Sequence, residues 1–282
     1  MIRFSPKDGC LDLAQTLDCG QAFRWKTVPR KEGGTAWRGI SRGHVLTVWE
    51  SDGGFCFDCA QEEFDAVWFS YFDFETDYAA ARHALSALDP ILREAAAYAA
   101  GIRILRQDPW EALCSFIVSQ NNNIPRIKGI LDRLCTLLGE PVSHAEEIYY
   151  TFPTAARLAA CTPEMLQPLR AGFRAKYLID AARRVASGEL DLEAVRRMPL
   201  DEARAALQTI FGVGPKVADC ALLYGLHRTE SFPMDVWMKR AMERLPGLDP
   251  ASLGESAGIA QQYIFHYARM HPELFGPETA AS

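Results

Sequence analysis

The feature that most constrains the fold is a glycine-rich turn between two helical patterns in residues 200–240. The turn reads Phe211-Gly212-Val213-Gly214-Pro215. Apolar residues recur at helical spacing on both sides of it, at Leu200, Ala203, Leu207 and Ile210 before it and at Val217, Cys220, Ala221 and Tyr224 after it. Gly212 and Gly214 are both expected at positive φ, and Pro215 suits the first position of a helix. The sequence therefore predicts a helix-hairpin-helix, whose exposed backbone N–H groups suit a bound phosphate.

Two side chains near this turn favour chemistry. Lys216 lies in the first turn of the second helix, where the helix dipole disfavours a cation. Burial at that place favours the neutral amine, which is the nucleophilic form of lysine. Asp235 precedes a helical pattern and is expected to cap it, and a cap alone stabilises a helix by about 1 kcal/mol. A carboxylate beside a pocket can also stabilise a developing cation, so the sequence leaves a catalytic pair and a plain helix cap both open.

Composition narrows the class of protein. No apolar run approaches the roughly 20 residues that span a bilayer, and the N-terminus lacks a signal-peptide core, so we expect a bacterial cytoplasmic protein without a membrane partner. The eight cysteines are scattered, and the tight set of four that an iron-sulfur cluster needs is missing. The net charge of −6 argues against a nucleic-acid partner, but a basic run between Arg170 and Arg184 offers a docking region.

The periodicities predict an α+β chain with two domains. Short segments rich in β-branched and aromatic residues predict an antiparallel sheet, with strands at Leu11 to Leu17, Ala22 to Trp25, Thr35 to Ile40, His44 to Glu50 and Phe55 to Phe57. A helix from about Phe64 to Phe72 would cover this sheet, and helices over 78–100 follow with a break at Asp89. From Pro109 to Met270 the pattern is helical throughout. We predict a sheet domain over 1–105 and an all-helical domain over 106–282, with a frayed end at 276–282.

Four motifs together resemble one family. They are residues 207–220 with 232–236, Cys19-Gly20-Gln21-Ala22-Phe23-Arg24-Trp25, Ser119-Gln120-Asn121-Asn122-Asn123-Ile124-Pro125-Arg126, and Gly172-Phe173-Arg174-Ala175-Lys176-Tyr177. They resemble the helix-hairpin-helix-Gly/Pro-Asp superfamily of DNA glycosylases, and within it the 8-oxoguanine DNA glycosylase/AP lyases. The resemblance covers nearly the whole chain, and implies a TBP-like N-terminal sheet domain followed by a helical glycosylase domain.

The resemblance implies how the reaction is divided among residues. Lys216 would be the nucleophile that displaces the damaged base, and Asp235 would activate it and stabilise the charge on the sugar. The extruded base would be recognised by four residues, Gly20, Cys220, Gln261 and Phe265. Gln261 and Phe265 are four residues apart in a helical pattern and so share a face. The Gly20 carbonyl would accept the N7 proton that 8-oxoguanine has and guanine lacks.

The resemblance also implies a DNA-binding set: Asn121, Arg126, Phe173, Arg174, Gly212, Gly214, Val217 and Trp237. In the family the asparagine fills the emptied space, the aromatic residue is a wedge, and the two arginines hold the orphaned cytosine. From the residues alone, Asn121 to Asn123 could simply cap or turn a helix, and Phe173 could belong to the core. No cofactor is expected to be required, although the carbonyls of Gln208, Ile210 and Val213 resemble those that hold K+ or Na+ in this superfamily.

The chain departs from the family pattern at two places. Trp237 stands where better-known members have histidine, and Phe173 where they have tyrosine. The expected partner is double-stranded DNA with 8-oxoguanine opposite cytosine, bound by a monomer. Two other hypotheses stay open: a superfamily glycosylase for oxidised pyrimidines or alkylated purines, and a non-catalytic protein that grips DNA through the hairpin. The missing cysteine cluster argues against a pyrimidine enzyme, and Lys216 argues against a monofunctional or non-catalytic one.

Overall fold

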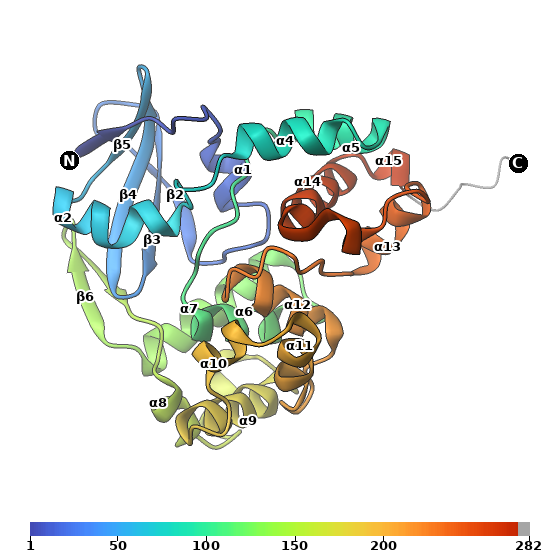
Figure 1. The fold of residues 1–282 in the computed structure, drawn as a ribbon. Coiled ribbons are helices and arrows are strands. Elements are labelled where there is room, and N and C mark those ends of the chain that lie inside the picture. The colour runs from blue at the N-terminus through green and yellow to red at the C-terminus, as the bar shows by residue number, and fades with distance from the viewer. Residues whose placement is uncertain (276–282) are drawn as a thin grey trace, which may run out of the picture.

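The computed structural model describes residues 1–275 and has an antiparallel sheet followed by a helical region (Figure 1). Residues 276–282, predicted to fray, lie outside the described residues. The sheet has the strand order β1-β5-β4-β3-β2, with every neighbouring pair antiparallel. Its strands are β1 Ile2–Phe4, β2 Trp25–Pro29, β3 Thr35–Ser41, β4 His44–Ser51 and β5 Gly54–Phe57. Within residues 1–275, no helix has the length and apolarity that crossing a membrane requires.

The first two predicted strands were wrong in detail. The segment assigned to Leu11 to Leu17 contains a short helix, α1 (Leu13–Leu17), whose N-cap Asp12 accepts a hydrogen bond from the Gln15 N–H. Leu13 and Leu17 are both buried, and their spacing of four residues is helical. The strand predicted from Ala22 begins only at Trp25, and β1 was missed because it is three residues long.

The predicted helix over the sheet is confirmed, with a π-helical turn inside it. It runs as α2 (Gln61–Glu63), η1 (Phe64–Trp68) and α3 (Phe69–Tyr71). Its buried aromatic side chains join those of the sheet in one small core. Trp25 from β2 lies in edge contact with Trp68, and Phe57 from β5 with Phe64.

The next two helices belong to a different core from the sheet. α4 (Tyr78–Ser86) and α5 (Pro90–Tyr98) are separated at Asp89, as predicted, and Asp89 caps α5. However, α5 packs against α14 (Ala257–Met270), and the buried residues of both helices lie in the large helical core. The boundary predicted between residues 105 and 106 falls in a segment without regular structure, but helices assigned to the N-terminal side pack with the C-terminal one.

The region after Pro109 is mostly helical, as predicted. Its remaining helices are α6 Pro109–Ser119, α7 Ile124–Leu138, α8 Ala155–Ala159, η2 Gln167–Leu169, α9 Arg174–Ala186, α10 Leu192–Arg197, α11 Leu200–Gln208, α12 Pro215–Tyr224, α13 Val236–Glu243, η3 Pro250–Ser256 and α15 Pro272–Phe275. The prediction of helix throughout was wrong at one place, where β6 (Pro141–His144) and β7 (Glu147–Tyr150) form a hairpin. Its turn residues Ala145 and Glu146 adopt positive φ without the usual asparagine or glycine, so no turn signal was available.

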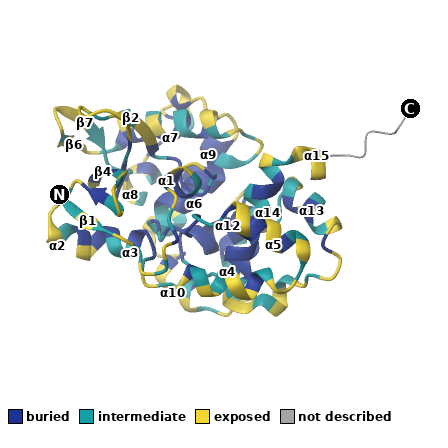
Figure 2. Ribbon diagram, turned by 90° about the horizontal axis from the view of Figure 1, so that it is seen from above, coloured by how far each residue is buried: buried dark blue, intermediate teal, exposed yellow. Residues whose placement is uncertain are grey.

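The helical core centres on α6 and α12, which pack against each other. Every residue of α12 from Val217 to Tyr224 is buried, and so are most of those of α6 (Figure 2). In Figure 1, α13, α14 and α15 lie beneath α4 and α5, while α6 to α12 form the other part of the helical region. The first turn of α12, with Pro215 and Lys216, is therefore continuous with a helix that is buried from Val217 onward.

Candidate active site

The predicted hairpin is confirmed, with α11 and α12 joined by residues 209–214. Gly212 has φ of +81°, and a Cβ there would lie 2.4 Å from the Tyr177 ring, so only glycine fits. The same expectation for Gly214 was wrong, because its φ is −94°. Gly214 is instead the N-cap of α12, with Pro215 at the first helical position. Among residues 1–275, no atom beyond the two chain neighbours of Gly214 lies within 4 Å of where its Cβ would be, so the backbone here is open to an approaching ligand.

Lys216 lies in the first turn of α12, half-buried at the wall of a cavity. Its Nζ donates to the Ser119 Oγ at 3.4 Å and lies 5.5 Å from the centre of the Phe116 ring. The Ser119 hydroxyl donates its own proton to the Phe116 carbonyl at 2.8 Å, so its oxygen is available as an acceptor. The amine is thus held between one polar contact and an aromatic face, both from α6.

Asp235 is the N-cap of α13, as predicted, and its Oδ1 accepts from the Met238 N–H at 2.8 Å. Asp235 and Lys216 line the same cavity, which has a volume of about 780 Å³. The cap role and a role beside the amine are therefore compatible in one side chain. The helix cap fixes where the carboxylate stands, because one of its oxygens is tied to the α13 backbone.

The cavity brings together eight of the predicted site residues. These are Gly20, Asn121, Gly214, Lys216, Val217, Asp235, Trp237 and Phe265. They come from the α1–β2 loop, the α6–α7 loop and the starts of α12 and α13, together with α14. Segments far apart in the sequence thus converge on the first turn of α12.

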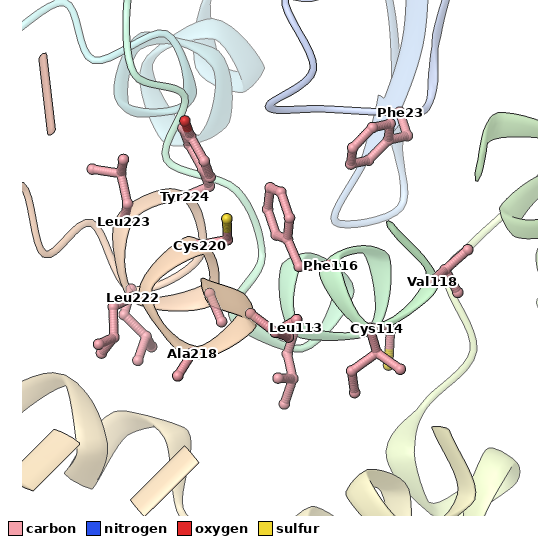
Figure 3. Packing of buried hydrophobic residues seen from close by; sticks show 14 of the residues in the cluster. Phe23, Leu113, Cys114, Phe116, Val118, Ala218, Cys220, Leu222, Leu223 and Tyr224 are labelled. Atoms are coloured by element: carbon pink, nitrogen blue, oxygen red, sulfur yellow. The ribbon is translucent and has the colours of Figure 1, made fainter. Parts of the chain in front are cut away.

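The residues predicted to recognise a base differ in their exposure. Gly20 has φ of +99°, and a Cβ there would lie 3.8 Å from the Phe265 ring, so these two are neighbours across the cavity. Cys220 is 3% exposed, and burial raises the pKa of its thiol to about 11, although the nearby Lys216 opposes the shift. Figure 3 shows Cys220 and Tyr224 of α12 on the same side as Phe116, with Phe23 beyond. Cys220 is therefore a neutral thiol just behind the cavity wall.

Gln261 does not line the cavity in this structure. It is 3% exposed, and its Nε2 donates to the Pro233 carbonyl at 3.1 Å. Its Oε1 lies 3.3 Å from the Tyr224 hydroxyl, whose single proton it shares with the Oε1 of Gln262. Both ends of the amide therefore have protein partners, and reading the edge of a base would require them to exchange.

The two arginines predicted to hold a cytosine are in different surroundings. Arg126 is exposed in the first turn of α7, whereas Arg174 is 3% exposed. The Arg174 guanidinium donates to the carbonyls of Gln120, Asn121 and Ala171. Burial and the charge of the nearby Arg126 lower the pKa of Arg174. In this structure Arg174 supports the loop that carries Asn121, and it is not itself exposed to a partner.

The loop after α6 presents Asn121. Its φ of +46° places it in the left-handed region, and it is exposed at the cavity edge. The capping alternative for residues 121–123 is confirmed at Asn123, which is the N-cap of α7 and accepts from the Arg126 N–H at 3.0 Å. Asn121 itself is therefore available to fill space beside the cavity.

Phe173 is 50% exposed, so the alternative that it belongs to the core was wrong. It lies in edge contact with Tyr177, which in turn contacts Phe211 of the hairpin turn.

The predicted basic docking run is smaller than the sequence indicated, because Arg174 is buried and Arg184 pairs with Asp180 and Glu189. Arg170, Lys176 and Arg183 remain exposed.

The carbonyls proposed for a monovalent cation lie at the end of α11 and in the hairpin turn. The Ile210 carbonyl accepts from the Val213 N–H at 3.0 Å, which leaves it one lone pair. Gln208 ends α11 one turn before Val213. Among residues 1–275, no three His, Cys, Asp or Glu side chains group as metal ligands would.

Several cavity residues were not assigned a role from the sequence. Phe23, Phe116, Ser119, Met234, Lys239 and Arg269 all line it. Phe116 and Ser119 were missed because α6 is buried on almost every side, so periodicity does not reveal which face borders a cavity. Arg269 carried a usable signal, since it follows Phe265 by four residues in one helix.

Comparisons with known proteins agree with this geometry. The family model for the N-terminal domain of 8-oxoguanine DNA glycosylase matches residues 1–113, and that of the HhH-GPD superfamily of base excision DNA repair proteins matches residues 114–259. The N-glycosylase/DNA lyase OGG1 of Arabidopsis thaliana is 32% identical over 90% of this chain and 76% of its own length.

Two solved structures are similar over the whole chain. The Clostridium acetobutylicum 8-oxoguanine glycosylase/lyase, bound to double-stranded DNA with cytosine opposite 8-oxoG, has a TM-score of 0.85 and 36% identity, covering 96% of this chain and 99% of that one. MBOgg1, in complex with a low-affinity DNA ligand, has a TM-score of 0.87 and 40% identity, covering 96% and 95%.

Proposed function

This chain belongs to the HhH-GPD superfamily of base excision DNA repair proteins, and we propose that Lys216 and Asp235 carry out its glycosylase and lyase chemistry. The protein is an 8-oxoguanine DNA glycosylase with associated AP lyase activity. The observation that supports the two residues is their place on one cavity, at the starts of α12 and α13.

The amine of Lys216 supplies the nucleophile. It attacks C1′ of the sugar, the C1′–N9 bond breaks with its electron pair leaving on the base, and the Nζ–C1′ bond forms. The amine loses a proton, which balances the proton that the departing base takes up, and the glycosylamine opens to a Schiff base as its C1′–O4′ bond breaks. Removal of a C2′ proton then breaks the C3′–O3′ bond and expels the 3′ phosphate. Asp235 stabilises the positive charge that develops on the sugar, as carboxylates do for an oxocarbenium ion in glycoside hydrolysis.

DNA binding presents the damaged nucleotide to this pair. Extrusion from the duplex costs a few kcal/mol of stacking and pairing. Asn121 fills the emptied space at the cavity edge, and the exposed Phe173 wedges the stack. Arg126 contacts the opposite cytosine, while Arg174 acts through the carbonyls of the Asn121 loop. The hairpin N–H groups at Gly212 and Gly214 bind the DNA backbone, joined by that of Val217, which in this structure donates to the Gly214 carbonyl at 3.1 Å, and Trp237 donates to a phosphate.

Recognition of the base follows from its chemistry. The Gly20 carbonyl accepts the N7 proton of 8-oxoguanine and repels the N7 lone pair of guanine. Phe265 stacks on one face of the base and Cys220 lies behind the other. Gln261 reads the pairing edge once its bonds to Tyr224 and Pro233 exchange.

Two finer features also belong to this proposal. The carbonyls of Gln208, Ile210 and Val213 suit K+ or Na+, which would fix the hairpin turn against DNA; no other cofactor is required. The protein acts as a monomer on double-stranded DNA carrying 8-oxoguanine opposite cytosine. Light scattering with and without duplex tests the monomeric state directly.

Borohydride trapping tests the proposed chemistry. The protein is incubated with duplexes carrying 8-oxoguanine, an oxidised pyrimidine or an alkylated purine, and any Schiff base is reduced to a stable adduct. We expect an adduct with the 8-oxoguanine duplex that disappears in Lys216→Gln. Absence of that adduct in the wild-type protein refutes the proposal, and adduct formation by Lys216→Gln refutes the assignment of the nucleophile.

A further inference from the structure

Arg269 is a cation in the wall of the proposed base pocket. It lies in the last turn of α14, four residues after Phe265 and eight after Gln261, so the three share one helix face. It lines the same cavity as Gly20, Phe265 and Lys216. A cation at a helix C-terminus stabilises the helix by interacting with its dipole, but that role alone requires no contact with the Cys19 carbonyl or the Phe265 ring.

The Arg269 side chain joins two recognition elements. Its Nη1 donates to the Cys19 carbonyl at 3.2 Å, directly before Gly20 in the chain. Its guanidinium carbon lies 5.4 Å from the centre of the Phe265 ring. A Cβ on Gly20 would lie 3.5 Å from the same Nη1. One planar guanidinium therefore contacts both the turn and the ring, which an ammonium on a flexible stem reproduces poorly.

The turn at Gly20 is anchored firmly on its other side. Gln21 is fully buried, and its Nε2 donates to the carbonyls of Thr16 and Arg103 at 2.9 and 2.8 Å. Its Oε1 accepts from the Leu105 N–H at 2.9 Å. The far side of the turn is thus fixed to the protein interior. On the other side of the turn, Arg269 of α14 donates to the Cys19 carbonyl, and Lys128 of α7 donates to the Oδ1 of the preceding Asp18 at 2.7 Å; of these two contacts, only that of Arg269 also reaches the Phe265 ring.

We propose that Arg269 is a positioning residue for lesion discrimination, which clamps the Cys19–Gly20 turn to the Phe265 ring. This inference rests on the proposed function. The carbonyl of Gly20 separates 8-oxoguanine from guanine only if it meets N7 in line while Phe265 stacks on the same base. Because the two elements come from the loop before β2 and from α14, their relative position depends on a link between them, and Arg269 provides it.

Binding measurements on three duplexes test the clamp. In the Lys216→Gln background, dissociation constants are measured for 8-oxoguanine opposite cytosine, guanine opposite cytosine, and a tetrahydrofuran abasic analogue opposite cytosine. For Arg269→Gln we expect the preference for 8-oxoguanine over guanine to fall at least tenfold, a change of about 1.4 kcal/mol. Affinity for the abasic duplex should stay within about twofold, because it has no base to recognise. We expect Arg269→Lys to fail to restore the preference.

A matched control removes an arginine elsewhere. Arg93→Gln deletes an exposed arginine of α5 whose Nε donates to the Ser86 carbonyl, and it should leave all three affinities unchanged. An unchanged preference in Arg269→Gln overturns the proposal, and so does an equal loss for all three duplexes, which would indicate a phosphate contact. Full recovery with Arg269→Lys also overturns it, since charge alone would suffice. If the parent protein has no preference for 8-oxoguanine, the proposed function fails instead.

Discussion

Asp235 is the residue at which a helix cap and a catalytic carboxylate can be separated experimentally. Its Oδ1 accepts from the Met238 N–H at 2.8 Å, and asparagine caps a helix as well as aspartate does. Asp235→Asn should therefore keep the free energy of unfolding, whereas Asp235→Ala should lower it by about 1 kcal/mol. A carboxylate within about 5 Å of the sugar cation, at an effective dielectric constant of about 20, stabilises it by about 3 kcal/mol. Both variants should then excise 8-oxoguanine about 100-fold more slowly.

Single-turnover excision and urea unfolding measure the two effects on the same protein samples. Asp191→Ala is the matched control, because Asp191 caps α10 through the N–H groups of Glu193 and Ala194, away from the cavity. It should lose about 1 kcal/mol of stability and keep the wild-type excision rate. If Asp235→Asn excises 8-oxoguanine at the wild-type rate, Asp235 is only a cap and the reasoning is refuted.

Three further predictions concern the hairpin, the half-buried His227 and the arginines. Gly212→Ala places a methyl group 2.4 Å from the Tyr177 ring at positive φ, and should lower the free energy of unfolding by at least about 1–2 kcal/mol and weaken duplex binding; unchanged urea unfolding contradicts this. Burial lowers the pKa of His227, so the unfolded state binds the proton more readily, and stability should fall as the pH drops below about 6.5. His227→Asn, which suits its φ of +52°, should show a smaller fall between pH 7 and 5 in urea unfolding, and an equal fall would exclude His227 as a source. Arg126→Ala should relax the preference for cytosine in excision assays without altering the melting temperature, whereas Arg174→Ala should lower both the melting temperature and the excision rate; the reverse pattern would exchange their roles.

The sequence predicted the hairpin and the helix-capping role of Asp235 because local rules determine both. The turn has positions that suit glycine and proline, which Gly212 and Pro215 occupy. Asp235 stands directly before a helical pattern. Prediction from the sequence failed where a helix is buried on almost every side or where a turn lacks its usual residues. The role of Phe116 was missed because α6 is buried on nearly all sides, and the β6–β7 hairpin was missed because Ala145 and Glu146 occupy a turn that usually requires other residues.

The state of a predicted side chain was harder to infer than its place in the fold. Gln261 and Arg174 were both predicted as site residues from the sequence, yet both are buried with protein partners. Hydrogen-bonding competitors such as the Pro233 carbonyl come from distant segments, and no sequence spacing reports them. Arg269 shows the opposite case, because helical spacing from Phe265 could have indicated that it borders the pocket.

Lys239 of α13 lines the same cavity as Lys216 and is the alternative nucleophile to the amine on the first turn of α12. The most direct measurement is mass spectrometry of the borohydride-reduced adduct formed with the 8-oxoguanine duplex, after proteolysis. We expect the sugar remnant on Lys216. A remnant on Lys239, or on any other lysine, would contradict this assignment.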